Sequence, residues 1–528
     1  MGFVLTLVYI TLTIIGPEQF GPEWASYHAF EYLAGITVLA SLPSILAHRH
    51  PRVSIQIWLV LGFIVTITLS LVVNRDFAAA VESWHSFMSN VAVFFFIVAN
   101  VNTIRRLKVL TLAVAAACMV VEVEALCGYY WGFRGATFVL RENLFSQYEE
   151  VIGTISRLRG VGFLNDPNDF AQTLLIALPL VYIAWRRGRI VTNSLLVIAP
   201  SALLLWGVYL THSRGALIAL AFLALMSSRK RLGTTASTVL AGTLIVAMMA
   251  LDFTGGRGIS AAEGADRIDA WASGLEMFKS APLFGVGFGN FTSFNDITAH
   301  NSFVLCLAEL GLVGSTLWVA LIVTVTMSLA RIIGRQEMRE SPPGGQKAPQ
   351  EAVNSVYPEI FSAFPLADDK VYSCGLETIP CCASEFRTKS DPIVPALVEG
   401  PISSGYVDYE EPAHFLVSAT VSCRAFASMV TPNASNIETQ LGSAYRQIVP
   451  KHWAMAMLLA LLSFMTTSWF LSRTYSTTMW LVIGLATSTI ALQRPAAESR
   501  DLGRWVFYTL GIETFAIILI YGIVRFAQ

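Results

Sequence analysis

Apolar residues gather into long runs that short polar stretches separate, and this alternation is the dominant pattern of the chain. Most runs approach the roughly 20 residues that a helix needs to cross a bilayer core of about 30 Å. The pattern therefore predicts an all-α, polytopic integral membrane protein with about 12–13 transmembrane helices. The thirteen segments cover residues 2–16, 29–47, 55–73, 88–102, 108–127, 171–185, 194–211, 214–228, 235–251, 302–330, 453–471, 476–492 and 505–524.

Lys and Arg cluster in every second connection between these segments. Short loops rich in these residues stay on the cytoplasmic side of a membrane. One orientation, with the N-terminus inside, satisfies all the clusters up to residue 335: Arg49 and Arg52; Arg105, Arg106 and Lys108; Arg186, Arg187 and Arg189; Arg229, Lys230 and Arg231; Arg331 and Arg335. The long connections 128–170 and 252–301 then face outward, together with 17–28, 74–87 and 212–214, and the C-terminus also lies outside.

Residues 337–451 interrupt the alternation. They are rich in Pro, Ser and acidic residues and contain no run long enough to span a membrane, so we expect little stable structure there. Cys374, Cys381 and Cys382 match no standard zinc spacing, and we expect reduced thiols without a metal. The predicted organisation is N-terminal transmembrane helices over 1–150, a core with long outward loops over 151–335, a cytoplasmic insertion over 336–451 and C-terminal transmembrane helices over 452–528.

The composition agrees with a membrane protein and narrows its partners. Hydrophobic residues make up 54% of the 528 residues and charged residues only 13%, against about a quarter charged in soluble domains. A formal net charge of -1 gives no basic field for a nucleic acid. The odd count of seven cysteines, without a repeated spacing, indicates no disulfide framework.

The first long outward loop ends in a polar stretch directly before an apolar segment. Arg159 lies in this stretch, and Asp166-Pro167-Asn168 closes it. Asp166 or Asn168 can cap the helix that begins there, because their side chains accept hydrogen bonds from free backbone N–H groups. Direct contact with a substrate is the equally weighted alternative.

Arg214 lies at the outer membrane interface, in the short connection Thr211-His212-Ser213-Arg214-Gly215. An arginine at this place often extends its side chain to the lipid headgroups. Its planar guanidinium also suits an anionic, lipid-linked substrate, because it binds phosphate oxygens in pairs. The residue alone favours the first interpretation.

The second long outward loop carries more candidate chemistry. Arg267 and Trp271 are four residues apart, so a helix would place them on one face. The stretch from Pro282 to Gly289 contains Gly-x-Gly-x-Gly, which we interpret as a tight surface loop because no predicted strand precedes it. His300 closes the loop at the outer mouth of the next helix, where it suits a general base or, as a lone histidine more often does, a helix cap.

These outward motifs together resemble the O-antigen ligase and O-antigen polymerase superfamily of bacterial membrane proteins. His300-Asn301 is followed after nine residues by Gly311 and Gly314, as in the signature of that superfamily. The Ser213-Arg214-Gly215 step, the stretch from Arg267 to Trp271, the Pro282–Gly289 turn and Asp166-Pro167-Asn168 occur in the same order as in the family. The resemblance covers about residues 150–335.

The resemblance implies a GT-C-like helical fold in the bacterial inner membrane and a glycan ligase or polymerase acting at the periplasmic face. The donor would be a glycan on undecaprenyl diphosphate and the acceptor a lipid or glycan hydroxyl. Carried over residue by residue, Arg214 and Arg267 would bind the diphosphate and His300 would deprotonate the acceptor, with inversion and without a metal or cofactor. Arg159, Asn168, Trp271 and Asn301 are the predicted substrate-binding residues.

Two features depart from the family, and several functions stay open. Family members usually have about twelve helices with both ends inside, whereas thirteen segments and a large insertion are predicted here. Ligase, polymerase and protein O-oligosaccharyltransferase need the same donor site, so the sequence does not separate them. A transporter of lipid-linked sugars is the alternative from another class, and would use charged residues within helices, with Glu122, Glu124 and Glu309 as candidates.

Overall fold

In a computed structural model, the described residues are 1–16, 29–47, 54–75, 77–145, 151–255, 261–340, 449–493 and 502–527. The residues of the predicted insertion from 341 to 448 lie outside this set, as do its cysteines. The helices belong to one compact unit, Met1–Arg339 with Gln447–Gln528. The apolar segments lie in α1 (Gly2–Ile15), α3 (Ala29–Ala47), α4 (Ile55–Val73), α5 (Phe77–Asn100), α6 (Ile104–Trp131), α8 (Pro167–Val181), α10 (Ala199–Leu210), α11 (Arg214–Ala250), α14 (Ser302–Glu340), α19 (Lys451–Ser468), α20 (Thr477–Gln493) and α21 (Leu502–Ala527).

Six helices in the described part of the chain are long and apolar enough to cross a membrane, which supports a helical, multi-pass membrane protein. They are Ile55–Val73, Ile104–Trp131, Ile190–Leu210, Arg214–Ala250, Ser302–Glu337 and Gly503–Ala527. Shorter apolar helical stretches of 10–17 residues are Gly2–Ile15, Ala29–Ile45, Trp84–Asn100 and Thr477–Gln493. The predicted segments 214–228 and 235–251 both fall within α11, whose helical geometry is interrupted at Gly233 with a φ of 81°.

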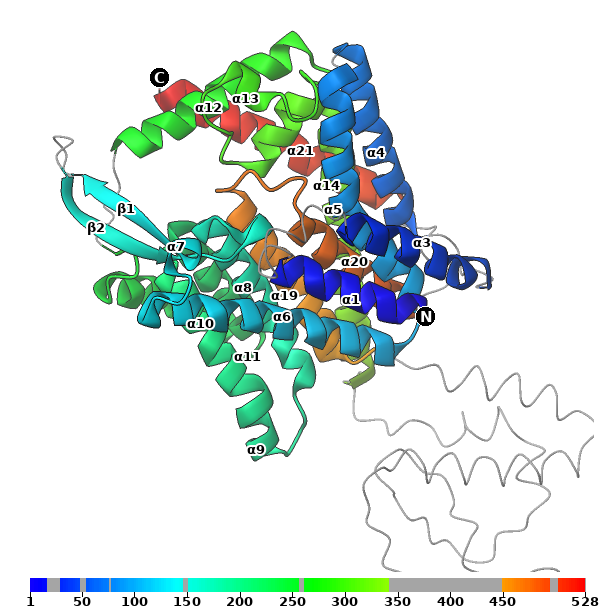
Figure 1. The fold of residues 1–528 in the computed structure, drawn as a ribbon, viewed down its shortest axis with the longest axis vertical. Helices are drawn as coiled ribbons and strands as arrows, with labels where there is room; N and C mark the ends of the chain where they lie inside the picture. The colour runs from blue at the N-terminus through cyan, green and yellow to red at the C-terminus, as the bar shows by residue number, and fades with distance from the viewer. Residues whose placement is uncertain are drawn as a thin grey trace, which may run out of the picture. The chain divides into compact units, whose positions relative to one another are not determined.

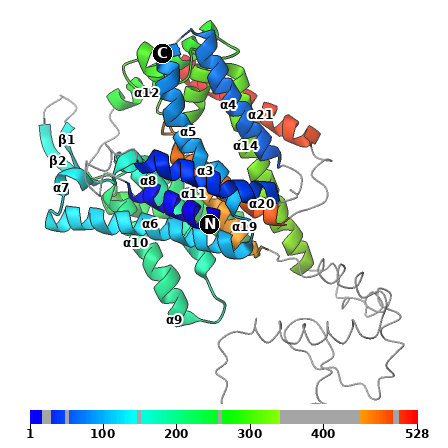
Figure 2. The same cartoon turned by 45° about the vertical axis from the view of Figure 1, so that its right-hand side comes forward.

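The helices pack around a shared apolar core. α8 packs against α19 and α10, α20 against α5, and α1 against α3 and α6. Trp480 of α20 is fully buried, and its ring contacts Phe63 and Phe87 of the neighbouring α4 and α5 at 6.0 and 5.8 Å between centroids. In both ribbon views α12 (Ala261–Ser280) and the C-terminus lie at one end of the bundle, and α9 (Ile190–Asn193) lies at the other (Figures 1 and 2).

The outward region 128–170, which we expected to be a loop, contains a β-hairpin, so the chain is not entirely α-helical. Strands β1 (Val139–Phe145) and β2 (Val151–Leu158) pair antiparallel, with Val139 opposite Leu158. The short α7 (Gly135–Phe138) precedes the hairpin, which projects from the bundle in Figure 1. Phe138 and Leu158 are fully buried and anchor its base.

Three helices connect two chemically different ends of the bundle. Lys230 of α11 and Lys451 of α19 both form ion pairs with Glu337 of α14, and the Lys451 pair measures 3.4 Å between nitrogen and oxygen. The opposite ends of the same helices carry Arg214, the turn after Ser468 and His300-Asn301. These ion pairs and the candidate residues therefore lie apart along the three helices. The orientation in the membrane stays a prediction.

Three helices that begin at the candidate end, α8, α11 and α14, have a polar N-cap. The Asp166 carboxylate accepts a hydrogen bond from Asn168 N at 2.7 Å and caps α8, which confirms the capping interpretation of Asp166-Pro167-Asn168. Ser213 Oγ accepts from Ala216 N and caps α11, and Asn301 Oδ1 accepts from Phe303 N and Val304 N at 2.9 and 3.1 Å at the start of α14. These caps fix where the chain leaves each helix and so position the residues beside them.

Candidate functional site

A cavity of about 280 Å³ opens at this end of the bundle, and four segments distant in sequence line it. Asp166 and Asn168 come from the start of α8, and Phe288, Gly289, Phe291, Thr292 and Thr298 come from the glycine-rich loop and the residues that follow it. His300, Leu305 and Glu309 come from the entry to α14 and its first turns, and Leu471, Ser472, Arg473 and Tyr475 come from the loop between α19 and α20. The cavity thus combines an imidazole, carboxylates and a guanidinium on a partly apolar wall.

His300 is a half-buried lining residue in an unusual backbone conformation. Its φ of 46° lies in the left-handed region, which non-glycine residues adopt rarely and at a cost. Burial lowers the pKa of His300 below its ordinary value, and the positive charges of Arg267 and Arg473 lower it further, against an opposing effect of Asp166. Its imidazole is therefore kept neutral near pH 7, the form that accepts a proton.

Helix α12 brings Arg267 and Trp271 to the segment that carries His300. Trp271 Nε1 donates a hydrogen bond to the Ala299 carbonyl at 2.9 Å, and its ring centroid lies 6.4 Å from that of Trp469. Arg267 lies one turn earlier on α12, and its positive charge lowers the pKa of His300. The spacing of four residues therefore places both side chains on the side of α12 that faces the site.

Arg214 begins α11 beside the loop between α19 and α20. It is half-buried, and the next residue, Gly215, lies against Phe470 of that loop, because a Cβ added at Gly215 would meet the Phe470 Cβ at 3.5 Å. The turn before Arg214 is held by Arg157 of β2, whose Nε donates to the Thr211 carbonyl at 2.8 Å. Arg214 thus borders the cavity region but is not among the cavity's lining residues.

Arg157 of β2 connects the hairpin to two segments near the cavity. Its side chain is 2% exposed and forms an ion pair with Glu142 of β1 at 2.8 Å. Its Nη2 donates to Asn168 Oδ1 at 3.0 Å. One guanidinium therefore links the hairpin, the start of α8 and the turn before α11, and breaking such a buried pair is costly.

The glycine-rich loop lies against a break in α14, not on the surface as the sequence suggested. Val286 and Phe288 are each 8% exposed. A Cβ at Gly285 would meet the Glu309 carbonyl carbon at 2.2 Å, and Gly285 has a φ of 67°. The glycine permits this close approach of two backbones. The buried Glu309 carboxylate accepts a hydrogen bond from Phe291 N at 3.1 Å and ties the loop to the cavity.

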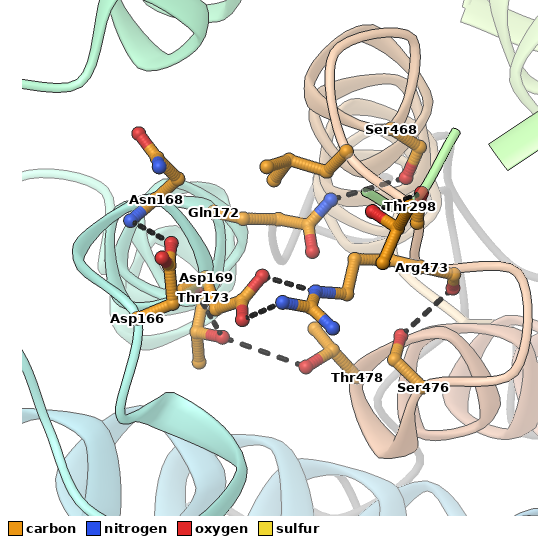
Figure 3. A network of polar contacts seen from close by, with 12 residues as sticks. Asp166, Asn168, Asp169, Gln172, Thr173, Thr298, Ser468, Arg473, Ser476 and Thr478 are labelled. Atoms are coloured by element: carbon orange, nitrogen blue, oxygen red, sulfur yellow. Dashed lines mark hydrogen bonds and ion pairs between the residues drawn. The ribbon is translucent and has the colours of Figure 1, made fainter. Parts of the chain in front are cut away.

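The loop between α19 and α20 contributes an arginine that forms an ion pair with α8. Arg473 Nε and Nη2 donate to the two oxygens of Asp169 (Figure 3). The Arg473 side chain is 37% exposed, whereas that of Asp169 is 8% exposed. Burial raises the pKa of Asp169, which precedes the apolar stretch of α8, to about 6, and the Asp166 charge also raises it, although Arg473 lowers it.

The structure distributes the predicted site residues unevenly. His300 and Asn168 line the cavity, and Arg267 acts on it electrostatically. Arg159 is half-buried and donates to the carbonyls of Ala136 and Thr137, and it is not among the lining residues. Asn301 is fully buried and serves as a helix cap, so contact with a substrate would need a rearrangement. Roles in binding stay predictions for all of them.

Sequence reasoning missed Arg473, Asp169 and Arg157. A usable signal existed for Arg473, because the short connection between the segments 453–471 and 476–492 faces outward in the predicted topology. An arginine on that side is uncommon, and the same observation had selected Arg214. Asp169 and Arg157 stood within motifs that were noted, but their burial depends on contacts with segments far away in the sequence.

Within the described ranges, no group of three or more His, Cys, Asp or Glu residues is arranged to hold a metal ion. The cavity lining contains the guanidinium of Arg473, the imidazole of His300 and the carboxylates of Asp166 and Glu309. Such a set suits the binding of an anion next to a group that transfers a proton.

Comparison with known proteins gives one match. Residues 199–319 match the family model described as O-antigen ligase, which confirms the resemblance found in the sequence. The matched residues include Arg214, Arg267, Trp271, His300 and Asn301, but neither the hairpin nor the loop that carries Arg473. No curated protein matches the chain, and no solved structure does.

Proposed function

We propose that this chain is a membrane glycosyltransferase of the O-antigen ligase type. It transfers or polymerises an oligosaccharide from undecaprenyl diphosphate onto an acceptor hydroxyl at the periplasmic face of the bacterial inner membrane. The observation that carries the proposal is a cavity lined by His300 and Arg473, with the charge of Arg267 acting on His300, within and beside the segment that matches the O-antigen ligase family. We also propose that the fold of the chain is GT-C-like.

In the proposed reaction, His300 takes the proton of the acceptor hydroxyl, whose oxygen attacks the anomeric carbon of the donor sugar. The bond from that carbon to the diphosphate breaks on the opposite side, so the configuration inverts. Arg214 and Arg267 meet the negative charge that grows on the leaving diphosphate. Fixed positive groups aimed at developing charge are a large source of catalysis, and they let the reaction proceed without a metal.

The test of this proposal is glycan transfer by the purified protein from a supplied undecaprenyl-diphosphate oligosaccharide. Arg214→Ala and Arg267→Ala are each expected to lower the rate about 10²-fold, because each removes a charge that stabilises the leaving group. Lysine at either position keeps the charge but loses the paired geometry, so partial activity is expected. Arg141→Ala, on the exposed side of β1, serves as the matched control and should leave the rate unchanged.

Product analysis separates the remaining functions. One new linkage to a lipid acceptor indicates a ligase, a ladder of repeats indicates a polymerase, and glycan on a hydroxyl of a protein indicates a protein O-oligosaccharyltransferase. Movement of the lipid across a vesicle membrane without any new linkage would replace the enzyme by the transporter alternative. In the structure Glu309 lines the same cavity as His300, whereas Glu122 accepts a hydrogen bond from Gly207 N inside the helix bundle.

The pH dependence of transfer should report the charges around His300. A base with a lowered pKa stays neutral to lower pH, so kcat/KM should fall only as the pH drops below the ordinary histidine value of about 6.5. Asp166→Asn removes a charge that raises this pKa, so the acidic midpoint should move to still lower pH. Arg267→Gln should move it to higher pH, because a charge that lowers the pKa is lost.

Two properties of these variants make the pH profile a specific test of His300. Asparagine caps helices as well as aspartate does, so Asp166→Asn preserves the start of α8. Arg267→Lys keeps the positive charge and should leave the midpoint in place. If the midpoint is the same in all variants, His300 is not the group that titrates in the reaction.

A further inference from the structure

The loop between α19 and α20, residues 469–476, is fixed to the segment that carries His300. Ser302, two residues after His300, donates from Oγ to the Leu471 carbonyl at 2.6 Å and accepts from Arg473 N at 2.8 Å. Thr474 Oγ1 donates to the Ser302 carbonyl at 2.6 Å. The loop therefore keeps a defined position relative to the imidazole, although about 170 residues separate the two in sequence.

The ion pair with Asp169 orients the Arg473 guanidinium. Nε and Nη2 face the two carboxylate oxygens, as Figure 3 shows. Within the described residues, no acceptor is hydrogen-bonded to Nη1, and the side chain remains 37% exposed and lines the cavity. A guanidinium held on one edge by a buried carboxylate presents its other nitrogen in a fixed direction at little further entropic cost.

Two acidic side chains of the cavity each accept a hydrogen bond from a backbone N–H group. The Asp166 carboxylate accepts the cap bond from Asn168 N, and the Glu309 carboxylate accepts from Phe291 N. The positive charge of Arg473 acts on His300, and so does that of Arg267. Two guanidinium groups thus act on the same imidazole from different elements, α12 and the loop 469–476.

We propose that Arg473 is a further anion-binding residue of the cavity, which donates from Nη1 to a phosphoryl oxygen of the donor's diphosphate while Asp169 holds the opposite edge of the guanidinium. This inference rests on the proposed function and names a binding residue outside the segment that matches the O-antigen ligase family. Charge-assisted bonds between guanidinium and phosphate are among the strong hydrogen bonds of proteins, and a diphosphate offers oxygens to Arg473 and to Arg267 together.

The test measures binding without transfer, on the full chain purified in detergent and titrated with inorganic pyrophosphate. We expect pyrophosphate to raise the unfolding temperature of the wild type and to do so more strongly than inorganic phosphate. Arg473→Gln should raise about 10-fold the pyrophosphate concentration that gives half of the maximal rise in unfolding temperature. Arg473→Lys should raise this concentration by less. Arg141→Ala provides the control, because this exposed arginine lies on β1, outside the cavity lining.

Arg473→Gln leaves the buried carboxylate of Asp169 without its partner, which can destabilise the fold. A second variant therefore separates a loss of binding from a loss of stability. Arg473→Gln with Asp169→Asn replaces both charges by amides that can bond to each other, and the same weakening of pyrophosphate binding is expected. If both variants bind pyrophosphate as tightly as the wild type, Arg473 has only a structural role and the inference fails. If the wild type binds no pyrophosphate at all, the diphosphate site of the proposed function fails with it.

Discussion

Replacing His300 with asparagine is expected to lower the rate of glycan transfer by about 10³-fold, within the range that general base catalysis contributes. Asparagine tolerates the left-handed backbone conformation better than most residues, and His300 has a φ of 46°. The substitution therefore removes the proton acceptor while the entry to α14 keeps its geometry. The measurement is the initial rate of transfer from a supplied lipid-diphosphate oligosaccharide at equal protein abundance.

A loss of proton transfer must be distinguished from a loss of folding or of donor binding. Pyrophosphate should still raise the unfolding temperature of His300→Asn, because the arginines that bind the diphosphate remain. His85→Asn is the matched control, since this histidine lies on α5 with 68% of its side chain exposed. Transfer by His300→Asn at more than a tenth of the wild-type rate would exclude His300 as the base.

The helices of this protein were predictable because their signal is local. Every apolar segment lies in a helix, and the caps Asp166 and Ser213 stand where the polar residues preceded an apolar run. The break at Gly233 follows the basic cluster that had separated two predicted segments. Hydrophobic periodicity and capping depend on neighbours within a few residues, so the sequence carries them directly.

The candidate site was predictable only where a residue was unusual for its place in the membrane topology. His300, Arg214 and Arg267 drew notice because cations and histidine stood on the outward side. The ion pair of Asp169 with Arg473 joins residues 304 positions apart, and no local pattern pairs them. The hairpin was missed although its strands contain 7 and 8 residues, and two partners of its Arg157 lie on two other segments.

The glycine-rich loop shows how the break in α14 depends on a distant segment. At Gly311 the helix leaves its regular geometry, with a φ of 63°. The freed carbonyls of Ala308 and Glu309 accept from Val286 N and Gly287 N at 3.0 and 3.1 Å. The N–H groups of Leu312 and Val313 donate to the carbonyls of Pro282 and Leu283 at 2.8 and 3.2 Å. Irregular backbone within a membrane helix needs such partners, because lipid supplies none.

Gly311→Ala is therefore expected to destabilise the protein by about 3 kcal/mol or more, since backbone strain and overpacking each cost about 1–3 kcal/mol. The new Cβ would lie 2.5 Å from the Leu283 carbonyl carbon, a backbone atom that cannot turn away. Thermal unfolding in detergent measures the effect, and transfer should be lost with it because Glu309 and Phe291 shift together. Gly334→Ala is the control in the same helix, where a Cβ meets nothing within 4 Å, and it should be neutral or slightly stabilising. Equal unfolding temperatures for the two variants would show that the glycine-rich loop does not press against α14 as described.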